Sequence, residues 1–293
     1  QQDSDVKVML SADPLHKGYS VLVLLPRDRY NSEVRQRIHD YLARELEATR
    51  VIFQLALTGD EEAYFRIHFF LTSPVPYGKL NIKEISQKIN RLTMTWDDFL
   101  SESLEAEMGN EGSRLAARYS GLIPEGYKAE ISLRQAVRDI RNLEKLADGG
   151  PMIEMENPDP EGDPSGSTHL TIYHQGGNIP LSRIFPILRN TGLEVLEQIS
   201  YQIPTPGQPS TIDIFRVLDP SGQAINLEKN GDRLREAILD ILNRRIASDL
   251  LNKLVLTAGL TSRQVYLLQA LRGHIFQLKP ATSISFITNT LLT

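Results

Sequence analysis

The residues best suited to bind a small anion lie between an apolar run and a predicted helix. This segment, residues 26–33 (PRDRYNSE), carries Arg27, Arg29, Asn31 and Ser32. Helix N-termini favour negative charge, because their backbone N–H groups are free and the helix dipole is positive there. Arginine adds paired donors for a carboxylate or phosphate. We therefore predict an effector- or anion-binding loop. The alternative is that these charges pair with neighbouring residues and fix the loop or an interface.

A glycine-rich loop occupies the equivalent place in the second half of the chain. Residues 175–180 (QGGNIP) follow an apolar run and include Gly176, Gly177 and Asn178. Two adjacent glycines permit positive φ angles and let a ligand approach the backbone closely. A small effector is one interpretation, and a simple tight turn is the other.

No motif for catalysis or for metal binding accompanies these loops. The sequence has no G-x-G-x-x-G, no G-x-x-x-x-G-K-[ST] and no G-x-S-x-G. It has no cysteine, and none of its six histidines has H-E-x-x-H spacing. His169 and His174 stand five apart on a predicted strand, so they should face opposite sides. We therefore expect no catalytic residue, no metal and no cofactor within this chain.

The composition is that of an ordinary globular protein of about two domains. The chain has 293 residues, 37 acidic and 32 basic, with a formal net charge of −5. This charge argues against a nucleic acid as the main partner, since phosphate binding needs clustered positive charge. No run of about 18 apolar residues predicts a membrane span, and the polar first residues do not resemble a signal peptide. A cytoplasmic location is expected. The chain also starts without Met, which fits a segment of a longer protein.

The periodicity of apolar residues predicts the same order of elements twice. Residues 1–18 look like a leader. An apolar strand at 19–25, a helix from 31 onward and alternating strands at 51–57 and 64–71 give the order βαββ, as in ferredoxin-like folds. The second half repeats this order with strands at 169–174, 193–203 and 211–218 around a short helix, in which Pro186 should fall near the first turn.

Helices are predicted between and after these two modules. One long helix is expected over 82–108, and Ser132 with Gln135 predicts a capping box that opens another. Residues 156–167 (ENPDPEGDPSGS) have the composition of a flexible linker, where limited proteolysis should cut first. We therefore predict an α+β chain with three domains. These are residues 19–150 (first βαββ module plus a helical segment), 151–232 (second βαββ module) and 233–293 (C-terminal helical motif).

Several stretches resemble the large, NAD-specific bacterial glutamate dehydrogenases. They are residues 23–48 (VLLPRDRYNSEVRQRIHDYLARELEA), 63–70 (AYFRIHFF), the Trp96-Asp97-Asp98 step with the later Arg118-Tyr119, 181–196 (LSRIFPILRNTGLEVL) and 251–272 (LNKLVLTAGLTSRQVYLLQALR). The resemblance extends over nearly the whole chain from about residue 19. The segments PRDRYN and LTAGL, in this order, are fairly specific to that family.

The resemblance implies two ACT-like βαββ modules with helical motifs, preceding a catalytic domain that lies outside this chain. It implies a non-catalytic regulatory and assembly region, NAD as the cofactor of the parent enzyme, and that enzyme's catalytic domain as a partner. ACT-type modules often bind amino acids at the loop between their first strand and first helix, so an amino-acid effector is implied. The alternative function is a purely structural region for oligomerisation.

The first pair of alternating strands carries apolar residues toward both faces of its sheet. A small βαββ module covers one face with its own helices and leaves the other open, and an open apolar patch normally marks an interface. We expect the other half of the chain, the 82–108 helix or another subunit to cover it, and a homo-oligomer in addition.

Overall fold

The computed structural model of the chain divides into two compact units, residues 1–102 and 103–293. The structure describes residues 6–13, 17–57, 64–146, 150–158, 166–177, 179–205, 208–278 and 283–292, apart from the side chains of Asp28 and Leu57. No helix in this described part is long and apolar enough to cross a membrane. The expected linker at 156–167 falls largely outside the described residues.

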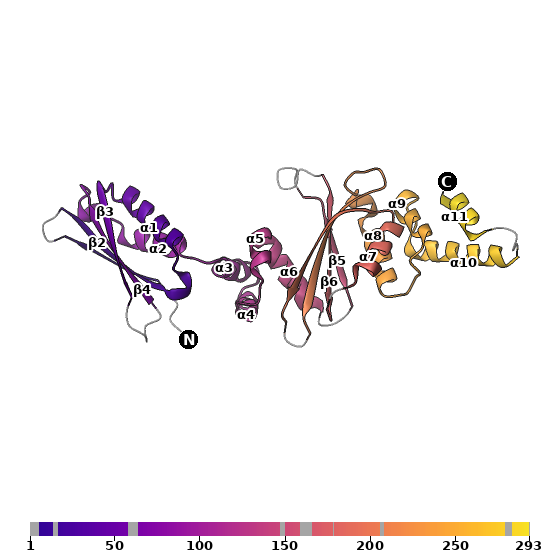
Figure 1. The fold of residues 1–293 in the computed structure, drawn as a ribbon, viewed down its shortest axis with the longest axis horizontal. Helices are drawn as coiled ribbons and strands as arrows, with labels where there is room; N and C mark the ends of the chain where they lie inside the picture. Colours follow the sequence, from indigo (N-terminus) through magenta and orange to yellow (C-terminus); the bar gives the residue numbers. More distant parts are fainter. Residues whose placement is uncertain are drawn as a thin grey trace. The chain divides into compact units, whose positions relative to one another are not determined.

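The first unit is a four-stranded antiparallel sheet with two helices packed on one side (Figure 1). Its elements are β1 (Lys7–Ala12), β2 (Gly18–Pro26), η1 (Arg27–Arg29), α1 (Ser32–Glu45), β3 (Arg50–Leu57), β4 (Tyr64–Thr72), η2 (Tyr77–Lys79) and α2 (Ile82–Leu92). The strand order is β1-β2-β4-β3. The predicted βαββ order is confirmed. The expectation of a leader over residues 1–18 is wrong for β1, which pairs with β2 along its whole length.

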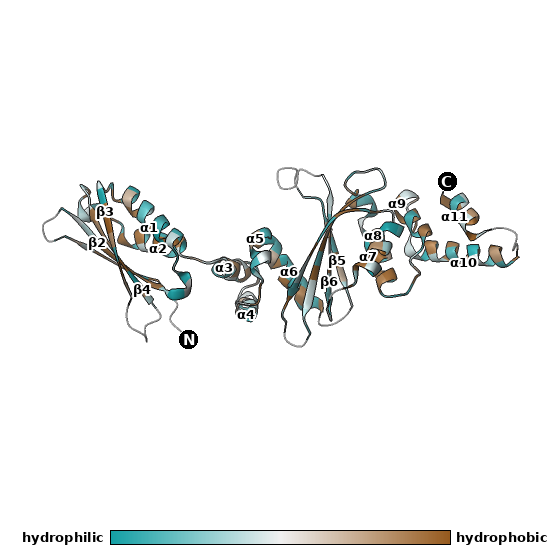
Figure 2. Cartoon of the chain, in the orientation of Figure 1, coloured by the Kyte–Doolittle hydropathy of each residue, from teal (hydrophilic) through white to brown (hydrophobic). Residues whose placement is uncertain are grey.

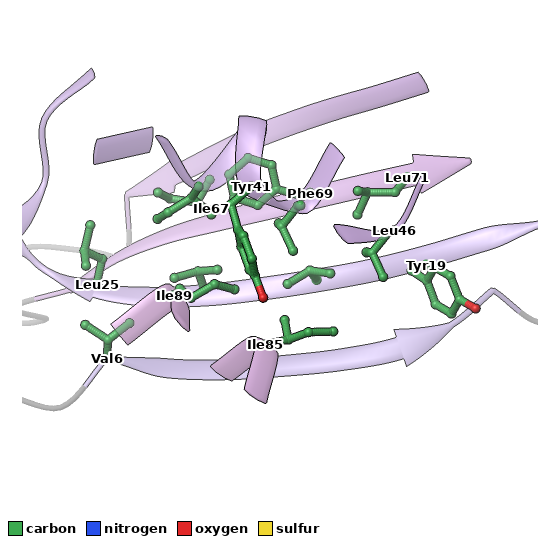
Figure 3. Packing of buried hydrophobic residues seen from close by; sticks show 14 of the residues in the cluster. Val6, Tyr19, Leu25, Tyr41, Leu46, Ile67, Phe69, Leu71, Ile85 and Ile89 are labelled. Atoms are coloured by element: carbon green, nitrogen blue, oxygen red, sulfur yellow. The ribbon is translucent and has the colours of Figure 1, made fainter. Parts of the chain in front are cut away.

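The core of this unit lies between the sheet and the two helices. Val34, Ile38 and Leu42 recur at helical spacing on α1 and are buried. They share one hydrophobic cluster with β2 side chains such as Leu25 and with Ile89 of α2, both of which Figure 3 labels. Alternate residues of a strand face opposite sides, so only one face of the sheet enters this core.

The predicted helix over 82–108 is two helices, α2 and α3 (Trp96–Met108). Thr95 and Asp98 form a capping box: the Asp98 N–H donates to Thr95 Oγ1 at 3.2 Å, and the Thr95 N–H donates to Asp98 Oδ2 at 2.8 Å. Such a reciprocal pair satisfies the free donors of a new helix start. The apolar spacing continues through the break, which is why periodicity alone predicted one helix.

The second unit contains another four-stranded antiparallel sheet, with helices on both faces. Its elements are α4 (Asn110–Tyr119), α5 (Glu125–Glu130), α6 (Leu133–Lys145), β5 (Met152–Glu156), β6 (Thr168–Gln175), α7 (Leu181–Asn190), β7 (Glu194–Ile203), β8 (Ser210–Leu218), α8 (Leu227–Leu242), η4 (Leu250–Lys253), α9 (Leu254–Thr257), α10 (Ser262–Leu278) and α11 (Ile284–Leu292). The strand order β5-β6-β8-β7 repeats that of the first sheet. The chain is therefore an α+β protein with two copies of one module.

Two expectations about the second module need correction. Strand β5 was not predicted, although it pairs with β6 over five residues. Pro186 lies well inside α7 and not in its first turn, because the helix already begins at Leu181. Ser132 caps α6 as predicted, with the Gln135 N–H donating to Ser132 Oγ at 3.2 Å. The other half of the capping box is replaced, because the Gln135 side chain bonds to Asp139 and Arg138.

The two faces of the second sheet are covered by different helices (Figure 1). Leu170 and Ile172 of β6 share a core with residues of α7 and α8. The alternate residues Thr171 and Tyr173 are also buried but face α5 and α6, where the Tyr173 hydroxyl donates to Asp139. The helices that precede this module in sequence thus cover the face that its own helices leave open.

Candidate functional site

Residues of the first predicted loop already form contacts within the chain. Arg29 Nη2 donates to Asp98 Oδ1 of α3 at 2.9 Å, and both side chains are about three-quarters buried or more. Asn31 is the N-cap of α1, with its Oδ1 accepting from the Val34 N–H at 2.7 Å. Arg27 and Ser32 are exposed. The structure therefore brings these four residues together, but Arg29 and Asn31 already have partners within the chain.

The second predicted loop is a glycine turn. Gly176 and Gly177 have φ angles of +89° and +93°, which L side chains rarely adopt. The Gly176 N–H donates to the Pro209 carbonyl at 3.1 Å, so the loop is tied to the start of β8. Asn178 lies outside the described residues.

A buried polar pair lies next to this turn. His174 Nε2 is 2.9 Å from Asp213 Oδ2, and both side chains are more than nine-tenths buried. Gln198 Nε2 donates to the other oxygen of Asp213 at 3.3 Å. His169 lies on the opposite face of β6, as its spacing from His174 predicts. Among the described residues, no group of three His, Cys, Asp or Glu is placed to hold a metal ion.

A second buried polar group joins α6 to the sheet. The carboxylate of Asp139 accepts hydrogen bonds from the Tyr127 hydroxyl at 2.5 Å, the Tyr173 hydroxyl at 2.7 Å and Gln135 Nε2 at 2.7 Å. Burial raises the pKa of Asp139, although its three donors oppose that effect. Burial likewise raises the pKa values of the Tyr127 and Tyr173 phenols, so both remain hydrogen-bond donors. This group holds α5 and α6 against β6.

Beside this group, a cleft remains between the two helices and the sheet. It encloses about 280 Å³ and is lined by Glu130, Ile131, Gln135, Glu156, His169, Thr171, Glu197, Ile199, Ile214 and Arg216. A neighbouring hollow of about 270 Å³ shares four of these residues and adds Arg138, Glu154, Met155 and Arg235. The floor is made of strand residues, and one wall comes from α5 and α6.

An ion pair lies at each side of the cleft. Arg216 Nε lies 2.9 Å from Glu197 Oε2 at the β7 side, and Arg138 Nη2 lies 2.7 Å from Glu156 Oε2 at the β5 side. Another charged residue of the lining, Glu130, accepts from the Tyr201 hydroxyl at 2.7 Å. Between the charges lie apolar side chains, so the cleft can accommodate a small ligand that carries both charges and an apolar part.

The sequence analysis did not predict the cleft or the Asp139 group. The lining residues come from six elements, and their spacing in the sequence has no regular pattern. One signal was present: Asp139 falls on the apolar stripe of α6, between Ala136 and Ile140. A carboxylate at such a position must find buried donors, so it marks a helix that packs on polar groups.

The two βαββ sheets, each with a pair of helices on one face, define a protein with tandem ACT-like modules. Matches to family models name them. The chain matches the glutamate dehydrogenase ACT2 domain at residues 7–97, helical motif 2 at 103–146, the ACT3 domain at 152–230 and helical motif 3 at 246–293. The chain thus belongs to the family of large NAD-specific glutamate dehydrogenases and corresponds to their ACT and helical-motif region.

Curated relatives agree with this assignment. The NAD-specific glutamate dehydrogenase of Halomonas elongata is 30% identical over 98% of this chain. Those of Pseudomonas aeruginosa and Mycobacterium tuberculosis are 26% and 29% identical over 99% and 97% of it. The chain spans only 18% of the length of each relative. A crystal structure of an unknown protein from Galdieria sulphuraria aligns over 78% of the chain, but its TM-score of 0.19 and 10% identity add nothing to the fold assignment.

Proposed function

We propose that this chain is a regulatory and assembly region of an NAD-dependent glutamate dehydrogenase. In this proposal the parent enzyme deaminates L-glutamate oxidatively to 2-oxoglutarate and ammonia. In this proposal the chain carries no catalytic group of its own. Its regulatory ligand is a small amino acid. The observation that carries the proposal is the charged cleft between α5, α6 and the second sheet.

The chemistry of the cleft fits an α-amino acid. Arg216, which lies beside Glu197, offers guanidinium N–H groups to a carboxylate. Glu130 and Glu156, which contact Tyr201 and Arg138, offer oxygens to an ammonium group. Ile199 and Ile214 supply an apolar floor for an aliphatic side chain. A charged ligand held in a partly buried site is recognised best when each of its charges meets an opposite one.

The position of the cleft fits regulation. One wall belongs to helical motif 2 and the floor to the ACT3 module. A ligand bound in the cleft contacts both, so it favours the arrangement in which they are closed on each other. Any partner that responds to this arrangement then responds to the ligand.

A thermal-shift screen of the purified chain with the common amino acids tests the proposal. A ligand present at about 100 times its Kd should add roughly 2.7 kcal/mol to the unfolding free energy. Arg216→Ala should remove the shift, while Arg263→Ala, an exposed change on α10, should keep it. If no amino acid shifts the unfolding temperature, or if the shift survives in Arg216→Ala, the effector proposal is wrong.

The second candidate function is assembly alone, and the surface of α10 supports it. Leu267, Leu271, Ile275 and Leu278 follow one another at helical spacing and are between 43% and 69% exposed. The opposite side of α10 packs Val265 and Leu268 into a core with α8 and α9. Figure 2 shows hydrophobic residues along both α10 and α11. A helix that is apolar on both sides is normally buried, and we propose the catalytic domain of the same parent chain as the partner.

Leu271→Gln tests this second function. In the chain alone the change should leave the unfolding temperature nearly unaltered, because the side chain is 56% exposed. In the parent enzyme it should weaken assembly and lower glutamate oxidation, whereas His274→Gln on the same helix should not. A parent enzyme with unchanged mass and activity after Leu271→Gln would contradict the assembly role.

A further inference from the structure

A cleft lined by three arginines lies within the second unit, where the matched ACT3 domain leads into helical motif 3. It encloses about 430 Å³. Arg183 of α7 lines it together with Arg244 and Arg245, which follow the end of α8. The lining also contains apolar side chains, among them Ile187 and Ile241. None of the residues that line it is acidic, and all of them belong to the described part of the chain. We call it the arginine cleft.

The three guanidinium groups keep N–H donors for a ligand. Arg183 Nη2 donates to the Leu242 carbonyl at 2.8 Å, which uses one of the five N–H groups of an arginine. Arg245 Nη1 lies 3.4 Å from Asp240 Oδ1, and the Arg245 side chain is 72% exposed. Arg244 forms no hydrogen bond or ion pair with a residue that the structure describes. A bound anion can therefore receive N–H groups from all three.

The aspartates that flank this segment in sequence already have partners. Asp240 accepts from Ser262 Oγ at 2.7 Å in addition to its contact with Arg245. Asp249 accepts from both Nη atoms of Arg272, at 2.9 and 2.7 Å, so these two charges balance each other. Three arginines against Asp240 alone leave an excess of two positive charges at the arginine cleft.

The backbone of Arg244 adopts a conformation that usually belongs to glycine. Its φ angle is +58°, and it directly follows Asn243, the C-cap of α8. Glycine is the common residue at this position, because a Cβ atom is disfavoured there. A helix C-terminus attracts cations, which accounts for the contact of Arg183 with the end of α8. It does not require an arginine at the strained position, and strained residues cluster at ligand sites.

We propose that the arginine cleft binds a small organic phosphate. Phosphate offers three oxygens and up to two negative charges, so it can accept from several guanidinium groups at once, whereas one carboxylate is satisfied by one arginine. The organic part lies against Ile187 and Ile241. The volume of 430 Å³ falls within the range of small-molecule pockets, roughly 300–1,000 Å³, and exceeds what a free phosphate ion needs.

The bound phosphate connects α7 of the ACT3 module to the first residues of helical motif 3. Ser248 belongs to that motif and lines the cleft. Its Oγ accepts from Asn190 Nδ2 at 3.0 Å, which leaves the hydroxyl hydrogen to donate to the ligand. The arginine cleft shares no lining residue with the proposed amino-acid site. The phosphate site can therefore be tested independently of that effector.

Isothermal titration calorimetry of the 293-residue chain tests the proposal, with phenyl phosphate as the probe. Phenyl phosphate should bind at one site per chain, and inorganic phosphate should bind more weakly because it lacks an apolar part. Benzoate carries a carboxylate on the same ring and should also bind more weakly. Absence of saturable binding at millimolar concentrations, or equal affinities for phenyl phosphate and benzoate, would overturn the proposal.

Substitutions that preserve the fold locate the site. Arg244→Gly should weaken phenyl phosphate binding about tenfold or more, since it removes hydrogen bonds to a charged group. Without ligand its unfolding temperature should stay the same or rise, because glycine accepts a positive φ angle. Arg245→Gln should weaken binding as well, and its exposed side chain makes a large loss of stability unlikely to accompany the change.

Two control variants separate the arginine cleft from general effects of backbone and charge. Glu47→Gly also replaces a residue with a positive φ angle, +45°, and lies in the first unit, so binding should stay unaltered. Arg263→Ala removes the same charge from the exposed side of α10 and should also leave binding unaltered. Wild-type affinity in Arg244→Gly would overturn the proposal, as would an equal loss of affinity in either control.

Discussion

Asn31 shows how a side chain that suits ligand binding can already be in use. Its carboxamide oxygen accepts from the Val34 N–H at 2.7 Å and so caps α1. Asn31→Ala should lower the free energy of unfolding by about 1 kcal/mol, the usual effect of losing an N-cap. Urea unfolding followed by circular dichroism measures it. Ser32→Ala, one residue further on and exposed, should have little effect; equal losses in the two variants would contradict the capping role.

The carboxylate of Asp139 gives a prediction about pH. Burial raises its pKa above the ordinary value of 3.8. The folded chain therefore binds this proton more tightly than the unfolded chain, and stability from this group is lost as the pH rises above 3.8. Relative to Asp139→Asn, the wild-type chain should thus become less stable as the pH rises from 3.8 toward the folded-state pKa of Asp139.

Urea denaturation of both proteins at a series of pH values measures this difference. Tyr173→Phe serves as a second probe, since it removes one donor from Asp139 and should cost about 1.5–3 kcal/mol at neutral pH. Tyr266→Phe, in which the ring is 51% exposed, is its control. A stability difference between wild type and Asp139→Asn that does not vary with pH would contradict the raised pKa.

At the scale of elements, Arg29 connects the loop after β2 to the start of α3. Asp98 both caps α3 and accepts from Arg29 at 2.9 Å. A double-mutant cycle with Arg29→Ala and Asp98→Ala should give a coupling energy of about 1 kcal/mol, somewhat above that of a fully exposed ion pair. Arg27→Ala should change the unfolding free energy by less than about 0.5 kcal/mol. A coupling energy near zero would return Arg29 to the list of candidate ligand-binding residues.

Elements with a strong apolar pattern were predictable, and elements defined by their partners were not. The alternation in 64–71 and the helical spacing of Val34, Ile38 and Leu42 gave the central strands and α1. Strands β1 and β5 are edge strands, and their sequences KVMLSA and MIEME carry few of the signals that mark a buried strand. The break before α3 could have been found, because Thr95 and Asp98 have the spacing of a capping box.

The candidate site, too, could be predicted only where it depends on local sequence. The two loops could be located, since a strand followed by a helix places a loop between them. The pairing of Arg29 in the first loop with Asp98 could not, because it is a contact between residues 69 apart in sequence. The cleft depends on the docking of one matched domain upon another, which neither periodicity nor a local motif records.

For the whole molecule, the proposed regulatory and assembly role predicts that the chain alone has no dehydrogenase activity. Its matched segments are ACT domains and helical motifs, and it has no G-x-G-x-x-G fingerprint for a dinucleotide. Purified protein with glutamate and NAD should show no increase in NADH absorbance, whereas the parent enzyme under the same conditions should. NADH production that a point change in this chain abolishes would overturn the prediction.

Two copies of one module in one polypeptide can misfold, since helices that belong on one sheet can pack on the other. Misassembly of this kind is a known failure of repeated and multidomain proteins. The hydrogen bonds of Asp139 protect against it. On the second sheet its carboxylate meets the hydroxyl of Tyr173, which pairs with the first residue of the edge strand β5. Leu24 pairs with the first residue of β1 in the same way, so on the first sheet the carboxylate would meet hydrocarbon. Burying a carboxylate without donors is strongly unfavourable, so packing of α6 on the first sheet is disfavoured. Two copies of one fold can therefore form in a single chain without exchanging the helices that pack on their sheets.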